Sequence, residues 1–216
     1  SEIHTAQAIG KKYVVFIQNG KPAKLRVANM ITGAIEKEFE LPVGNPDNVH
    51  PQFRHARLTD AGTIMVAHKD MGKVAEYDVN GKQVWSVAAE SPWSAVPLDN
   101  GNVLISGGGN KTVTEVNRKG ETVWQYSPAD LPAEYTFADV QVSLRLSNGN
   151  TIINNWDSRQ WQGKRNTTVV QAIEVGPDKK IVWTLRAWTV PDSLGRSTII
   201  QPLDVFIKKR RFGEFK

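Results

Sequence analysis

Residues 97–106, with the sequence PLDNGNVLIS, carry the pattern that decides the fold: an Asn-Gly turn followed by a run of aliphatic residues. The pattern recurs at residues 57–66 (RLTDAGTIMV) and at residues 145–154 (RLSNGNTIIN). Asn-Gly, and its Asp-Ala-Gly variant, supply the positive φ angles that a short hairpin turn requires, and the flanking β-branched residues favour strands. Each copy therefore predicts two antiparallel strands joined by a tight turn.

A second hairpin follows each of these copies and ends on a tryptophan. It lies at residues 74–85 (VAEYDVNGKQVW), 113–124 (VTEVNRKGETVW) and 171–183 (QAIEVGPDKKIVW). Two hairpins make one four-stranded antiparallel sheet, and a sheet of this kind that recurs about an axis is the blade of a β-propeller. The sequence therefore predicts an all-β repeat protein.

Weaker copies at both ends complete the array. Equivalent positions recur at Ala8, Arg57, Pro97, Arg145 and Pro202, a spacing typical of the roughly 40 to 50 residues of a propeller blade. We expect four clear blades and a partial fifth in the array 1–204. Either the N-terminal residues complete the fifth blade and close the ring or, as we favour, the array is a portion of a larger propeller. The expected boundaries are about 1–45, 46–90, 91–132 and 133–190, with the partial blade at 195–207 and a basic C-terminal tail at 208–216.

The composition excludes several classes of site. The chain of 216 residues has no cysteine, which rules out disulfide frameworks, thiolate metal sites and cysteine nucleophiles. Its net charge of +5 is scattered, apart from the run Lys208–Arg211, and such a run is typical of a solvated tail. We therefore predict no nucleic-acid partner. No window of about eighteen apolar residues exists and the N-terminus lacks the layout of a signal peptide, so we expect no membrane insertion and a soluble or already processed chain.

The motifs resemble those of a known superfamily. The Leu-x-Asn-Gly-Asn turn at residues 98–102 and 146–150, the Glu-x-Asx pair at residues 76–78, and Gly-Lys-x-Val-Trp at residues 81–85 are similar to the quinoprotein-like (PQQ-like) and arylsulfotransferase-like β-propellers, and to their uncharacterised secreted bacterial branch. The resemblance covers about residues 1–204. It implies a secreted or periplasmic bacterial protein, and commonly six to eight blades. Turn and packing positions carry it, so it says little about chemistry.

Trp85, Trp124 and Trp183 share one position of the repeat. A bulky residue that recurs at one strand position is expected to pack between neighbouring blades rather than to bind a ligand. Asp157, Arg159, Trp161 and Arg165 instead form a polar and aromatic insertion, typical of a loop that binds a sugar or another protein, although a solvated connection is the simpler interpretation.

The innermost strand of each blade lines the central channel of a propeller, so residues at the start of these strands converge on one central face. The concentration of histidines there, with an arginine, favours a functional role, although a water-filled channel also tolerates polar residues. The ligand-binding residues predicted on this basis are His4, Gln52, Arg54, His55, Trp93, Asp139 and Gln141.

The leading hypothesis is a non-catalytic binding or scaffold domain that presents this polar face to a small molecule, a glycan or a protein; the oligomeric state is left open. The alternative is an enzyme of the arylsulfotransferase-like or glycan-acting type, with His4, His50 or His55 as the nucleophile, His50 and His55 foremost, and Arg54 as the cationic clamp. A quinone cofactor would need more than Asp139 and Trp93, so we expect no cofactor. A zinc site from the histidines is an open alternative, but we predict no metal.

Overall fold

The computed structural model describes residues 1–157, 169–188, 194–203 and 209–216. Within these residues the chain is all-β apart from one short 3-10 turn at Pro128–Asp130, and it forms four separate four-stranded antiparallel sheets. The predicted fold class is therefore confirmed. No helix of the described part is long and apolar enough to span a bilayer.

Each sheet follows the chain order of its strands, from an inner first strand to an outer fourth strand. The strands are β1 (Glu2–Ile9), β2 (Tyr13–Asn19), β3 (Ala23–Asn29), β4 (Ile35–Leu41), β5 (Phe53–Leu58), β6 (Ile64–His68), β7 (Lys73–Tyr77), β8 (Gln83–Ala88), β9 (Pro92–Pro97), β10 (Val103–Gly107), β11 (Val113–Val116), β12 (Thr122–Tyr126), β13 (Val140–Arg145), β14 (Thr151–Asn155), β15 (Ala172–Val175) and β16 (Ile181–Leu185).

The Asn-Gly turns join two antiparallel strands as the sequence predicts, although only the glycine, and not the asparagine before it, has a positive φ. Between β9 and β10, the Gly101 N–H donates to the Leu98 carbonyl at 3.0 Å, and the Leu98 N–H donates to the Asn102 carbonyl at 2.9 Å. Gly101 has a φ of +83°. This is a type I turn followed by a left-handed residue, the usual form of a slightly longer hairpin loop. Because the left-handed region is costly for residues with a Cβ, glycine fixes the register here.

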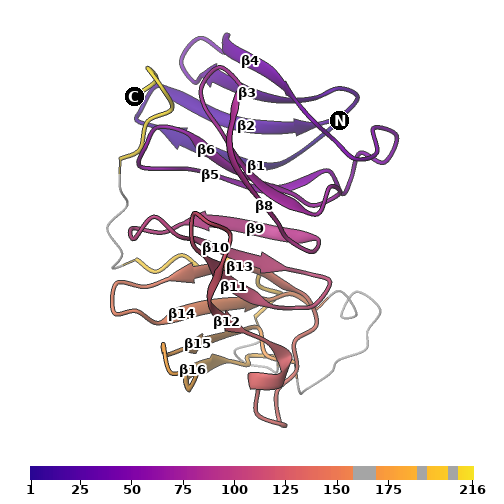
Figure 1. Cartoon of the computed structure of the whole chain (residues 1–216), viewed down its shortest axis with the longest axis vertical. Coiled ribbons are helices and arrows are strands. Elements are labelled where there is room, and N and C mark those ends of the chain that lie inside the picture. Colours follow the sequence, from indigo (N-terminus) through magenta and orange to yellow (C-terminus); the bar gives the residue numbers. More distant parts are fainter. Residues whose placement is uncertain (158–168, 189–193, 204–208) are drawn as a thin grey trace.

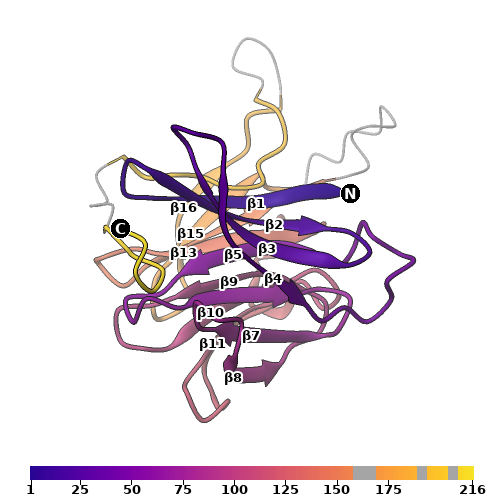
Figure 2. The same cartoon turned by 90° about the horizontal axis from the view of Figure 1, so that it is seen from above.

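The sheets succeed one another in chain order from the top to the bottom of Figure 1, and Figure 2 shows them from above. The inner strand of each blade contacts the inner strand of the next, through the pairs β1–β5, β5–β9 and β9–β13. The four inner strands therefore stand side by side about a common axis, as the repeat predicts.

Apolar clusters lie between the blades. The first joins blades 1 and 2 and includes Ile17, Leu25 and Phe53. A smaller one between blades 2 and 3 includes Met65, and the cluster between blades 3 and 4 includes Tyr126. Because one face of a sheet must be hidden from water, each blade is stabilised mainly by its neighbour.

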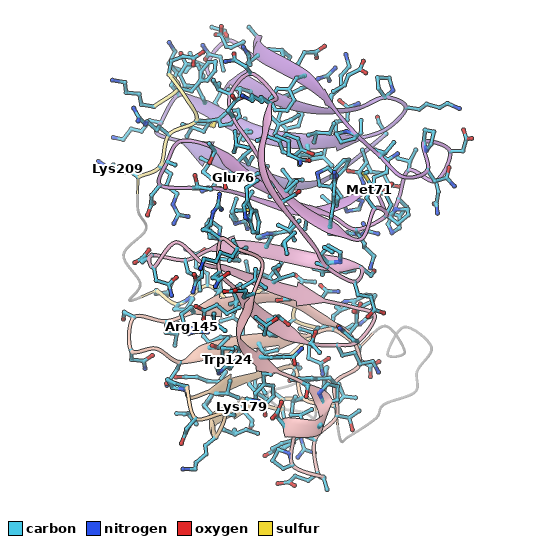
Figure 3. All side chains as sticks on the ribbon, viewed as in Figure 1. Met71, Glu76, Trp124, Arg145, Lys179 and Lys209 are labelled. Atoms are coloured by element: carbon cyan, nitrogen blue, oxygen red, sulfur yellow. The ribbon has the colours of Figure 1, made fainter. Side chains whose placement is uncertain are left out.

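Polar contacts repeat at the outer part of these interfaces. The Trp124 indole N–H donates to the Pro177 carbonyl of blade 4 at 3.2 Å, and the Arg145 guanidinium lies 5.0 Å from the Trp124 ring centroid. Arg145 also pairs with the buried Glu115 at 2.9 Å. Figure 3 labels Arg145 and Trp124 side by side at this interface. The predicted packing role of this tryptophan is confirmed.

The interface between blades 2 and 3 repeats this arrangement. The Trp85 indole N–H donates to the Arg118 carbonyl at 2.8 Å, and the Arg118 guanidinium lies 4.5 Å from the Trp85 ring. Arg118 also pairs with the buried Glu76 at 2.5 Å. Trp183 of blade 4 differs, because 43 % of its surface is exposed. The packing prediction thus holds for two of the three tryptophans.

The C-terminal segment differs from its prediction as a solvated tail. Phe212 is fully buried in the cluster between blades 1 and 2, the Gly213 N–H donates to the Gly62 carbonyl at 2.9 Å, and Arg210 pairs with Asp60 at 2.8 Å. The segment lies against the first two blades in Figure 1. The prediction was based on the basic residues 208–211 and not on the aromatic residues after them. Burying these aromatic side chains stabilises the packed segment by more free energy than solvation of the charges would provide.

The predicted partial fifth blade stays a prediction. Residues 194–203 form no strand, although the Thr198 carbonyl accepts a hydrogen bond of 3.3 Å from the Val142 N–H of β13. Residues 204–208 lie outside the described residues, and so do residues 158–168, which contain most of the predicted polar and aromatic insertion.

Gly101→Ala should destabilise the protein by about 1–2 kcal/mol, because a Cβ at a φ of +83° is strained even though no atom lies within 4 Å of its position. Gly101→Asn should cost less, since asparagine tolerates this region. The measurement is urea unfolding. Gly195→Ala is the control, because that site is equally open and has no positive φ; an equal effect of both alanine variants would contradict the explanation.

Glu115→Gln should destabilise the protein by roughly 1.5–3 kcal/mol at pH 7, because it removes the charge that faces Arg145 across the interface. Burial raises the pKa of Glu115, but hydrogen bonds from Asn102 and Asn100 and the Arg145 charge together bring it below 4.5. The contribution is therefore complete above pH 4.5 and is lost as the pH falls through the lower pKa of the folded state.

Unfolding of wild type and this variant should accordingly converge in acid. The matched control is Glu121→Gln, which changes an exposed carboxylate in the turn that precedes β12. A difference between wild type and Glu115→Gln that is as large at pH 3 as at pH 7 would be inconsistent with a stabilising ion pair.

Candidate functional site

The antiparallel topology places two kinds of segment at the same end of the molecule. Each inner strand begins at this end, and the connection between the second and third strands of each blade returns to it. We call the surface here the axial face and define it by the residues that these segments supply. They are Glu2, His4, His50, Arg54, Lys69, Trp93 and Asp139.

Trp93 lies at the centre of the interactions of this face. It stands on β9, and its ring has the Arg54 guanidinium of β5 at 5.2 Å and the Lys69 ammonium at 4.8 Å. Lys69 belongs to the connection between β6 and β7, and its backbone N–H donates to the Gln52 carbonyl at 3.0 Å. Two cations from blade 2 are therefore held against one aromatic ring of blade 3.

Neither cation is neutralised by a carboxylate within 4.0 Å among the described residues. Arg54 contacts the His4 ring instead, with its Nη1 at 2.8 Å from His4 Nε2, and its buried Nε has no hydrogen-bond partner in the described ranges. Burial lowers the pKa of Arg54 and of Lys69. Half-buried cations without a counter-ion attract anionic groups, because an anion restores the interactions that burial removes.

Asp139 is the carboxylate whose charge acts on Lys69, whereas both Glu2 and Asp139 act on Arg54, Glu2 more strongly. Burial raises the pKa of Asp139, and the charge of Lys69 opposes this rise. Its backbone is held by Asn155, whose Oδ1 accepts from the N–H groups of Ala138 at 2.8 Å and Asp139 at 3.0 Å. Gln141 also hydrogen-bonds the Asp139 carboxylate. The blade 4 side of the face is therefore acidic and fixed in position.

The structure thus brings four of the predicted ligand-binding residues to the axial face: His4, Arg54, Trp93 and Asp139. Gln141 is only 1 % exposed, so it is a buried residue that hydrogen-bonds the Asp139 carboxylate and not part of the surface. Gln52 and His55 are placed elsewhere. Gln52 is fully buried and exchanges two hydrogen bonds with the backbone of Gly20, at 2.8 and 3.0 Å. It joins blades 1 and 2.

His55 is 3 % exposed, and its Nδ1 accepts a hydrogen bond from the Ala95 N–H at 3.4 Å. Burial holds its pKa well below the ordinary value. It therefore lies within the blade interface as a neutral side chain and not on the axial face. Adjacent residues of a strand point to opposite sides, which explains why Arg54 and His55 separate.

Sequence reasoning missed Lys69 and Glu2. Lys69 lies in a connection between second and third strands, and the predicted antiparallel order alone would have placed that connection at this face. Glu2 precedes His4 by two residues on β1, and its Oε2 lies 2.7 Å from both His4 Nε2 and His50 Nδ1. The period of two along a strand was the available signal for it.

Taken together, these contacts give a surface with an aromatic centre, two partly desolvated cations, and a carboxylate on one side. Such a surface can hold a planar or extended ligand that bears an anionic group, with the ring providing contact area and the cations providing charge.

Solved structures with the same architecture support the fold. The crystal structure of a protein of unknown function from Bacteroides caccae is 25% identical with a TM-score of 0.71, over 87% of this chain and 68% of that one. A streptogramin B lyase is 14% identical with a TM-score of 0.58, over 83% and 53%. BamB from Moraxella catarrhalis is 13% identical with a TM-score of 0.51, over 91% and 53%. The chain therefore spans between half and about two thirds of the length of these proteins.

No curated protein sequence matches the chain. A family profile does: the profile described as outer membrane protein assembly factor BamB matches residues 43–155, just over half of the sequence. The match runs from the connection before blade 2 to the end of β14, and it includes the repeated turns and two of the interface tryptophans. The chain therefore belongs to this PQQ-like family of β-propellers.

Proposed function

We propose that this chain is a scaffold propeller that binds a protein partner at its axial face, and that Arg54, Lys69 and Trp93 hold an acidic side chain or an acidic segment of that partner. The observation that carries the proposal is the pair of half-buried cations stacked on Trp93 without a carboxylate counter-ion among the described residues. Interfaces are enriched in tryptophan and arginine, which supply contact area and charge together.

The family supports a protein partner over a small molecule, because its profile is named for an assembly factor. The same name favours a secreted or periplasmic location in a bacterium, which we propose for this chain as well. The axial face suits this role because it combines positive charge on blade 2 with the acidic Asp139 on blade 4. A partner segment would be oriented by both.

The enzyme alternative has less support. The proposed histidine nucleophile His55 is buried in the blade interface. A second candidate, His50, has Glu2 as its hydrogen-bond partner at 2.7 Å, and Arg54 contacts the third candidate, His4. His4 Nε2 also lies 2.7 Å from Glu2 Oε2, and no specific observation favours transfer chemistry.

Lys69→Met should weaken the binding of acidic peptides by about tenfold, which is ~1.4 kcal/mol, because it removes one of the two cations but keeps the length of the side chain. The measurement uses an array of glutamate-rich peptides followed by calorimetric titration of the best binder. Binding should also weaken as salt is added, since the charges of the face are partly exposed.

Two controls make this test specific. Lys24→Met removes a lysine that pairs with Glu38 on the outer part of blade 1, so it should leave peptide binding unchanged. Peptides with glutamine in place of glutamate should bind poorly. Equal binding of the two peptide series, or wild-type affinity in the Lys69→Met protein, would refute the proposal.

A further inference from the structure

Three side chains of metal-ligand type meet at the blade 1 edge of the axial face. Glu2 and His4 lie on β1, and His50 lies in the connection that leads to β5. Glu2 Oε2 is 2.7 Å from His4 Nε2 and 2.7 Å from His50 Nδ1. The two imidazole rings meet edge to face, with centroids 5.2 Å apart. One carboxylate oxygen therefore receives hydrogen bonds from two histidines of different segments.

The ligand atoms of this cluster already lie close to the arrangement of a metal site. One atom from each residue lies within 4.8 Å of the others. Ligands about 2.1 Å from a tetrahedral metal ion stand about 3.4 Å apart. Binding would require the carboxylate oxygen to move outward from both nitrogens by less than about 1 Å. Glu2 is 41% exposed and His50 is 64% exposed, so both side chains have room for this adjustment.

We propose that Glu2, His4 and His50 form a binding site for a divalent transition-metal ion, with Zn²⁺ as the ion that suits the ligands best. Two imidazole nitrogens and one carboxylate oxygen are a common set of three protein ligands for zinc. The fourth position faces solvent and takes water or a group of a bound partner. The site is separate from the cation–aromatic contact of the proposed function, although both belong to the axial face.

Arg54 sets the strength of this site. Its Nη1 lies 2.8 Å from His4 Nε2, the nitrogen that would bind the ion, and 3.0 Å from His4 Nδ1. A guanidinium at this distance opposes a dication and must turn away when the metal binds. Its other contact, the Trp93 ring at 5.2 Å, is available to receive it. Removing the Arg54 charge should therefore strengthen metal binding.

The test is calorimetric titration of the chain, without a histidine tag, with ZnCl₂. Wild type should bind one equivalent. His50→Ala and Glu2→Gln should each weaken binding by more than about tenfold, since loss even of an outer-shell partner costs 10–100-fold. Both substitutions affect side chains that are open to solvent, and unchanged thermal unfolding confirms that the variants are folded.

Glu38→Gln is the matched control, because Glu38 is 39% exposed and lies on the same blade, and it should bind zinc as wild type does. Arg54→Gln should bind zinc more tightly, by about tenfold. Titration with Co²⁺ gives a second readout, because a four-coordinate cobalt site absorbs visible light strongly and this absorption should vanish in His50→Ala. Absence of zinc binding by wild type, or equal binding by wild type, His50→Ala and Glu2→Gln, overturns the proposal.

The outcomes are distinguishable from those of the proposed function. Lys69 makes no contact with the three ligands in the described structure, so Lys69→Met should retain zinc binding while losing affinity for acidic peptides. His50→Ala should show the opposite pattern. Loss of both properties in both variants would contradict two separate sites.

Discussion

Each four-stranded sheet of this protein has apolar side chains that can be hidden from water only against the next sheet. The clusters around Phe53, Met65 and Tyr126 meet this requirement between successive blades. A sheet alone would expose these residues, so the blades are stable as a series and not singly. The same requirement explains why the C-terminal segment, despite its basic residues, places Phe212 in the cluster between blades 1 and 2.

Packing between blades also determines where polar chemistry can occur. The middle of each inner strand is covered by neighbouring blades, whereas its first residues lie at an end of the molecule where polar side chains reach solvent. Arg54 and Trp93 come from the starts of two inner strands, and Lys69 comes from a connection at the same end. A surface assembled from several blades follows from the propeller geometry, and its charge depends on a few residues outside the repeat.

The two proposed sites use this surface differently. Around Trp93, Arg54 and Lys69 are half-buried with no carboxylate within 4.0 Å in the part of the chain that the structure describes, which makes them attractive to anions. At the other site, the Glu2 carboxylate accepts hydrogen bonds from His4 and His50, and a metal ion would replace these two hydrogen bonds. Arg54 joins the two because it contacts both His4 and Trp93. A ligand at one site would therefore alter the orientation of the side chain that serves the other.

The sequence by itself determined the four-stranded blade, because turn chemistry and the alternation of side chains along a strand depend on residues close together in the chain. The positive φ of Gly101 and the tryptophan at one strand position are of this local kind. It also placed His4, Arg54 and Trp93 at one end. Only the tertiary structure decided that Gln52 and His55 are buried between blades, that Lys69 and Glu2 join the face, and that Phe212 packs into the core. These outcomes depend on the side of a strand that each residue takes and on contacts between segments far apart in the chain, which a local pattern does not encode.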